Sequence, residues 1–127
     1  MAYLWIALGG ALGSMGRYWA SNFIDGRAGK AFPWSTLLVN VTGSFVIGLL
    51  AAWLVGENRW QAQPRRREFL MIGLCGGYTT FSSFSLDALN LLRASHWFQA
   101  GAYAVLSLVL CLAAVWLGHA LGQLVHR

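Results

Sequence analysis

Four long stretches of the sequence carry almost no charged side chain. They cover residues from about 3–23, 35–56, 69–92 and 97–124. A helix that spans a bilayer needs about 20 predominantly apolar residues, and each stretch is that long. Charged residues make up 10% of the chain and hydrophobic residues 57%, which does not suit a soluble domain. The sequence therefore predicts an all-α membrane protein with four transmembrane helices in a single domain over residues 1–127.

The formal net charge of +5 alone would also fit a protein that binds nucleic acid. Arg65, Arg66 and Arg67, however, form one short cluster between the second and third apolar stretches. Arginines that flank a transmembrane helix usually face anionic lipid headgroups. We therefore expect contacts with membrane lipid and no nucleic acid partner.

Basic residues are divided almost evenly between the two ends of the predicted helices. The side that holds the N-terminus collects Arg59, Arg65, Arg66, Arg67 and Arg127, and the other collects Arg27, Lys30 and Arg93, with Arg17 nearby inside the first helix. Because loop Lys and Arg residues set orientation, this balance is compatible with insertion in both directions. The sequence predicts an antiparallel, dual-topology homodimer. A bundle of four helices fills its own centre with side chains, so any path for a solute would lie between subunits.

Polar and small residues form stripes inside two of the predicted spans. Residues four apart share one face of a helix, and the stripes are Thr36, Asn40, Ser44 and Gly48 on the second helix, and Tyr103, Ser107 and Cys111 on the fourth. Helix packing is the favoured interpretation for Ser44, Gly48 and Cys111. The Asn40 carboxamide has two N–H donors to satisfy at membrane depth, which favours a functional or network role.

The third predicted helix contains poor helix formers in mid-span. Its sequence there is Gly76-Gly77-Tyr78-Thr79-Thr80-Phe81-Ser82-Ser83-Phe84-Ser85. Two glycines and two threonines predict a non-helical break there, with a cation site expected at Gly76 to Thr79. Such breaks persist in membranes only where they bind something or line a cavity. Phe81 and Phe84 share a face after the break. Core packing would explain an aromatic pair, but the interleaved serine hydroxyls favour a pore.

Two charged residues and two cysteines inside the spans have several readings. Arg17 could extend to the membrane interface or take part in binding. Asp87 is the only carboxylate within a predicted span, and it could pair with a cation or cap the mouth of a pore. Cys75 and Cys111 show neither disulfide spacing nor a metal-binding pattern, so we interpret both as small lipophilic residues.

These residues resemble the Fluc/CrcB family of small fluoride channels over almost the whole chain. The likeness rests on Gly9-Gly10-x-x-Gly13-x-x-x-Arg17-Tyr18, on Thr36-x-x-x-Asn40-x-x-Gly43-Ser44-Phe45-x-x-Gly48, and on Gly76-Gly77-x-Thr79-Thr80-Phe81-Ser82-x-Phe84-Ser85. The resemblance implies a fluoride-selective channel that exports fluoride passively as an antiparallel homodimer. It also implies a multi-pass protein of the bacterial cytoplasmic (inner) membrane that gives fluoride resistance.

The resemblance also assigns roles to individual positions. It makes Phe81 and Phe84 an aromatic box beside the fluoride path, with Asn40 as a donor. It implies a structural sodium ion at the dimer interface, held by the backbone carbonyls of Gly76 and Thr79. The expected pore residues are Thr36, Asn40, Ser82, Ser83, Phe81, Phe84, Tyr103 and Ser107, with Arg17 and Asp87 in a possible vestibule.

The sequence departs from the family pattern at two positions. Cys111 stands where some members carry a serine, and Asp87 stands where many carry glutamate, so the roles of both remain open. The main rival interpretation is a four-helix exporter of cationic drugs, but the first helix lacks the membrane carboxylate that such exporters use. A non-transporting subunit would leave the break unexplained. No pair of nucleophile and base indicates an enzyme.

Overall fold

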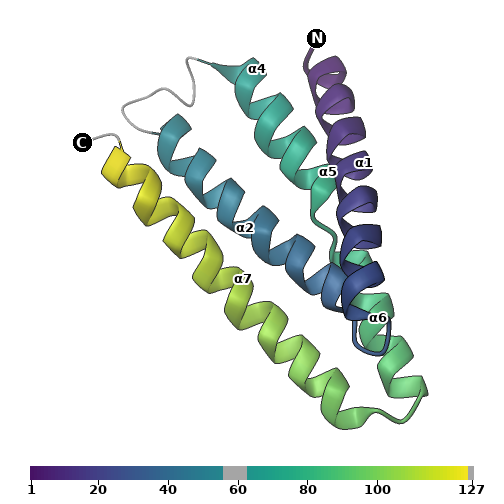
Figure 1. The fold of residues 1–127 in the computed structure, drawn as a ribbon. Coiled ribbons are helices and arrows are strands. Elements are labelled where there is room, and N and C mark those ends of the chain that lie inside the picture. Colours follow the sequence, from purple (N-terminus) through teal and green to yellow (C-terminus); the bar gives the residue numbers. More distant parts are fainter. Residues whose placement is uncertain (56–62, 126–127) are drawn as a thin grey trace.

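The computed structural model describes residues 1–55 and 63–125 (Figure 1). Arg59 and Arg127, which entered the charge balance, lie outside this part of the chain. Every regular element within it is helical. The elements are α1 (Ala2–Ala28), α2 (Trp34–Val55), α4 (Pro64–Arg66), η2 (Arg67–Cys75), α5 (Gly76–Tyr78), α6 (Phe81–Arg93) and α7 (Trp97–Val125). The prediction of an all-helical protein is confirmed.

The end of the first helix differs from the prediction. α1 continues to Ala28 instead of ending near residue 23. The Arg27 guanidinium carbon lies 3.6 Å from the centroid of the Phe23 ring, a cation–π contact that favours one more turn. α1 then ends at Gly29, where φ is 77°, a conformation that glycine adopts without steric cost.

In the described part of the chain, three helical stretches are long and apolar enough to cross a membrane. They are Trp34–Leu54, Pro64–Arg93 and Trp97–Val125. α1 has 27 residues, but glycines, Ser14 and Arg17 dilute its apolar side chains. Three of the predicted spans are thus confirmed by length and composition, and the first stays a prediction.

The helices form two parallel pairs. Figure 1 shows α2 and α7 side by side, and α1 beside the segment that includes α4 and α5. Glycine makes both approaches possible: a Cβ at Gly118 on α7 would collide with the Phe45 carbonyl, and a Cβ at Gly77 would lie 2.6 Å from the Gly10 carbonyl oxygen. Small residues allow such close packing in membranes, and the packing interpretation of Gly48 agrees with its position against the Val115 carbonyl.

The third membrane stretch changes partners along its length. Its first half, η2 and α5, packs against α1, whereas α6 packs against α7 and α2. η2 is a π-helix of nine residues, which the sequence did not predict. The change of partner occurs at a two-residue interruption between α5 and α6, and this interruption defines the candidate site.

Candidate functional site

The helix break consists of two extended threonines. Thr79 has φ −81° and ψ 157°, and Thr80 has φ −152° and ψ 119°. β-branched side chains such as threonine favour this region over the helix. Gly76 is helical, with φ −63° and ψ −37°, so the expected extent of the break from Gly76 to Thr79 is corrected. The break lies after the glycines.

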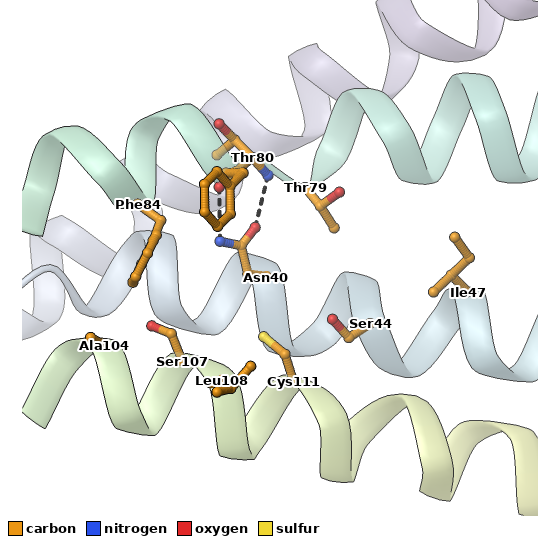
Figure 2. Close-up of a pocket in the computed structure, with 11 residues that line it drawn as sticks. Asn40, Ser44, Ile47, Thr79, Thr80, Phe84, Ala104, Ser107, Leu108 and Cys111 are labelled. Atoms are coloured by element: carbon orange, nitrogen blue, oxygen red, sulfur yellow. Dashed lines mark hydrogen bonds between the residues drawn. The ribbon is translucent and has the colours of Figure 1, made fainter.

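The side chain of Asn40 holds the break from the neighbouring helix α2. Asn40 Nδ2 donates to the Thr80 carbonyl at 3.0 Å, and the Thr80 N–H donates to Asn40 Oδ1 at 2.8 Å (Figure 2). One carboxamide thus satisfies both backbone groups of Thr80. Without it, the N–H and the carbonyl would lie unpaired in lipid, which costs free energy. Nδ2 carries two N–H donors, so one of them is not used by Thr80.

Thr80 also begins the next helix. Its Oγ1 accepts a hydrogen bond from the Ser83 N–H at 3.1 Å, which is the usual arrangement of a threonine N-cap. The Ser82 hydroxyl lies 3.2 Å from the same oxygen. The N-terminus of α6 therefore lies near the middle of the candidate span Pro64–Arg93, and its positive dipole end is directed at the break.

The break also changes the hydrogen bonding of two carbonyls named in the sodium expectation. In a continuous helix the Thr80 N–H would bond to the Gly76 carbonyl, but here it bonds to Asn40. The Thr79 carbonyl accepts a long hydrogen bond of 3.4 Å from Arg17 Nη1 and retains a second lone pair. Both oxygens are hard ligands of the kind that suits a sodium ion, so the residues fit the expected cation.

A large cavity lies beside the break, between α2, α6 and α7. It has a volume of about 480 Å³. Its wall is formed by Asn40, Ser44, Ile47, Thr79, Thr80, Phe81, Phe84, Ala104, Ser107, Leu108 and Cys111 (Figure 2). We call it the Asn40 cavity. The wall is mostly apolar and includes no charged side chain.

Two aromatic rings and one hydroxyl give the Asn40 cavity its chemical character. The ring centroids of Phe81 and Phe84 are 5.4 Å apart, so the two rings are neighbours on α6 as the spacing predicted. The Phe81 ring is 79% exposed in the single chain. Ser107 is only 9% exposed, and its Oγ has no hydrogen-bond partner among the described residues. A buried hydroxyl without a partner is costly, so this oxygen favours a polar guest.

A second cavity of about 290 Å³ lies on the other side of Thr80. Its wall is formed by Ser14, Arg17, Tyr18, Ser21, Thr36, Val39, Thr80 and Ser83. We call it the Arg17 cavity. Its wall has a larger share of polar side chains than the wall of the Asn40 cavity, and Arg17 gives it a positive charge. Thr80 is the residue that both walls share. Of the expected pore residues, four line the Asn40 cavity and two, Thr36 and Ser83, line the Arg17 cavity, whereas Ser82 and Tyr103 belong to neither wall.

Asp87 accepts hydrogen bonds from two hydroxyls that we expected along the fluoride path. Thr36 Oγ1 donates to Asp87 Oδ2 at 2.7 Å, and the Tyr103 hydroxyl donates to the same oxygen at 3.2 Å. Tyr103 is fully buried, with its ring centroid 5.1 Å from that of Phe84. In this structure the two hydroxyl protons are therefore directed at a carboxylate and not at the Asn40 cavity.

Several residues at the site were not singled out from the sequence. Thr80 was read only as part of the break, although it is the partner of Asn40 and the cap of α6. Ser44 and Cys111 were read as packing residues, and both contribute to the wall of the Asn40 cavity. Their four-residue spacing from Asn40 and Ser107 was the available signal.

These features define a class: a helical, multi-pass membrane protein with one candidate span broken near its middle, beside a mostly apolar cavity whose wall has no charged side chain. Residues 4–119 match the family model described as CrcB-like protein, Camphor Resistance (CrcB). The chain belongs to the CrcB family.

Relatives of the chain cover nearly all of it. It is 48% identical to a fluoride-specific ion channel FluC of Methylocella silvestris, over 100% of this chain and 97% of the relative. It is 56% identical to a protein of the same name from Opitutus terrae, over 92% of this chain and 89% of the relative. It is 49% identical to a third such protein, from Rhodospirillum rubrum, over 100% of this chain and 98% of the relative. These relatives are named as ion channels and not as enzymes.

Proposed function

We propose that this protein is a fluoride-selective channel that lets fluoride leave the cell passively across the bacterial cytoplasmic membrane and thereby gives fluoride resistance. Membership of the CrcB family supports the class, and the names of the relatives support the ion. The observation that carries the mechanism is the unpartnered Ser107 hydroxyl in the wall of an uncharged cavity beside two phenylalanines.

The Asn40 cavity offers what a small anion needs in transit. Fluoride is strongly hydrated, so a path must replace its water with hydrogen-bond donors. Ser107 Oγ supplies one donor, and the second N–H of Asn40 Nδ2 supplies another. The positive edges of the Phe81 and Phe84 rings add a weaker attraction. None of these groups carries a full charge, so the ion can bind and still leave.

The Arg17 cavity suits the entry of the same ion. Arg17 lies in its wall, and a positive side chain beside an aqueous opening raises the local concentration of anions. The N-terminus of α6 adds a partial positive charge at Thr80. An anion that enters here is one residue away from the Asn40 cavity, because Thr80 belongs to both walls.

The proposal includes an antiparallel homodimer with a structural sodium ion. Phe81 is 79% exposed in the single chain, and a partner subunit would enclose that ring and complete the path. The carbonyls of Gly76 and Thr79 would hold the sodium ion together with the same carbonyls of the partner. When bound, the ion would supply a fixed positive potential near the path without a charged side chain in it.

A flux measurement tests the proposed function. The purified protein is reconstituted in liposomes loaded with potassium fluoride, and external fluoride is followed with a selective electrode after a potassium ionophore is added. We expect rapid fluoride release and none of chloride from matched chloride-loaded liposomes. Release that equals that of protein-free liposomes would refute the proposal, and equal release of both anions would refute the selectivity.

A further inference from the structure

One thiol lies in the wall of the Asn40 cavity, and the function proposed above does not use it. Cys111 is partly exposed and contributes to that wall. Figure 2 shows its side chain on α7, in the space between α7 and α2, near Ser44. No disulfide involves it, since Cys111 is a free cysteine. The cavity of about 480 Å³ leaves room for a small group attached to its sulfur.

A neighbouring serine gives this part of the wall an unsatisfied polar group. Ser107 lies one turn before Cys111 on the same face of α7. Its side chain is 9% exposed, and its Oγ has no partner among the described residues. Because a buried hydroxyl left unpaired is costly, this oxygen favours a polar guest in the cavity beside it. Cys111 is partly exposed in the same wall, so a small reagent that enters the cavity comes within reach of its sulfur.

The other thiol of the chain has a different environment. Cys75 is 3% exposed, and it ends the π-helix that packs against α1. It borders a separate, smaller cavity of about 220 Å³ formed with Gly13, Gly16 and apolar side chains. Nothing polar on that wall demands a partner as Ser107 does. Cys75 is therefore a matched control within the same chain.

We propose that Cys111 is a modification site for small, neutral, thiol-reactive electrophiles, and that an adduct on its sulfur blocks ion passage through the Asn40 cavity. The second half rests on the proposed channel function, because a block has meaning only if the cavity conducts. An adduct would lie one helical turn from the Ser107 hydroxyl and opposite Asn40, where it displaces the water or ion that bonds to them.

The probe is methyl methanethiosulfonate, which transfers a methylthio group. The thiol proton of Cys111 goes to solvent, and Sγ attacks the sulfenyl sulfur of the reagent. A disulfide bond forms between Sγ and that sulfur, the sulfur–sulfur bond of the reagent breaks, and its electron pair leaves with methanesulfinate. The cysteine sulfur is oxidised to the disulfide level and the reagent is reduced to sulfinate. A dithiol reductant reverses the reaction and releases methanethiol.

The experiment joins a chemical readout to a functional one. The full-length protein in liposomes is treated with the reagent, and peptide mass spectrometry reports the adduct on Cys111 and on Cys75 separately. Fluoride release is measured before treatment, after it, and after reduction. Cys111→Ala and Cys75→Ala are treated in parallel, and each variant is compared with its own untreated release.

We expect the adduct mainly on Cys111 and a fall in fluoride release of about tenfold, as for an obstructed pore, with recovery after reduction. Cys111→Ala should lose this sensitivity and Cys75→Ala should retain it. An unmodified Cys111, equal modification of both cysteines, or a Cys111 adduct without a change in release would each overturn the inference. If the untreated protein releases no fluoride, the channel function fails, while the adduct map still decides whether Cys111 is the accessible thiol.

Discussion

Asn40 on α2 and Thr80 between α5 and α6 are joined by two reciprocal hydrogen bonds, at 3.0 Å and 2.8 Å. The pair makes the carboxamide a substitute for the helical partners that the break removes. Asn40 is therefore a positioning residue for the break as well as a donor to the Asn40 cavity. A substitution at this position tests both roles, and they are separated by measuring stability beside flux.

Asn40→Ala should destabilise the folded protein. The N–H and carbonyl of Thr80 would lose their partners in a low-dielectric region, at a cost of about 1–3 kcal/mol for each buried group left unpaired. Denaturation in detergent, followed by circular dichroism, measures the change. Asn22→Ala is the matched control, because Asn22 is exposed on α1. Equal stability of the two variants would contradict the positioning role.

Phe81→Leu should reduce flux without a matching loss of stability. The side chain is 79% exposed, so its truncation leaves no core cavity in the single chain, but it removes the positive ring edge beside the path. We expect fluoride release to fall by about tenfold. This factor corresponds to a loss of about 1.4 kcal/mol in the interaction between the ring and the ion. Phe98→Leu is the control, since Phe98 is 88% exposed at the start of α7. Unchanged release in Phe81→Leu would remove this ring from the path.

Tyr103→Phe and Asp87→Ala should show coupled effects on stability. The Tyr103 hydroxyl donates to a carboxylate, and hydrogen bonds to charged groups contribute about 1.5–3 kcal/mol. Tyr103→Phe should therefore be costly in the native background and nearly neutral in Asp87→Ala. The double-mutant cycle isolates this coupling. Additive effects would mean that the 3.2 Å contact does not stabilise the protein.

Gly76→Ala should fold as a chain and weaken the dimer. Gly76 is helical, and a Cβ there would approach only the Met71 carbonyl oxygen, at 3.8 Å. Any loss must then come from the proposed interface and its sodium ion. We expect a shift from dimer to monomer in size-exclusion chromatography with light scattering, and a similar shift for the native protein after exhaustive sodium removal. Thr79→Ser should be mild, because the ligand is a backbone oxygen.

The controls for this prediction come from the same segment. Gly77→Ala should disturb the chain itself, because its Cβ would lie 2.6 Å from the Gly10 carbonyl oxygen. Circular dichroism distinguishes this outcome from dimer loss in Gly76→Ala. A dimer that withstands both Gly76→Ala and sodium removal would contradict the proposed site.

The near balance of basic residues predicts that the protein inserts in both orientations. A tag after Arg127 should be accessible from both faces of the membrane, as measured with impermeant labels on intact and permeabilised cells. Lysines added at residues 94–96, between α6 and α7, should bias the chain toward one orientation. A native tag that is accessible from one side only would exclude the antiparallel dimer.

The sequence by itself determined the helical architecture and the membrane environment. Long apolar stretches have few ways to satisfy their backbone in lipid, and the helix does so within each segment. The motif around Thr79 and Thr80 also determined that a break occurs, because two β-branched residues follow two glycines. These are local properties, which a single segment carries with it.

Only the tertiary structure decided where the break falls and which hydroxyls remain free. The break lies at Thr79 and Thr80 because Asn40, forty residues away, pairs with Thr80. Asp87 accepts from Thr36 and Tyr103, whereas Ser107 is left with no partner among the described residues. The rotation and depth of each helix against its neighbours determine which donor reaches which acceptor, and the spacing of residues along one helix does not contain that information.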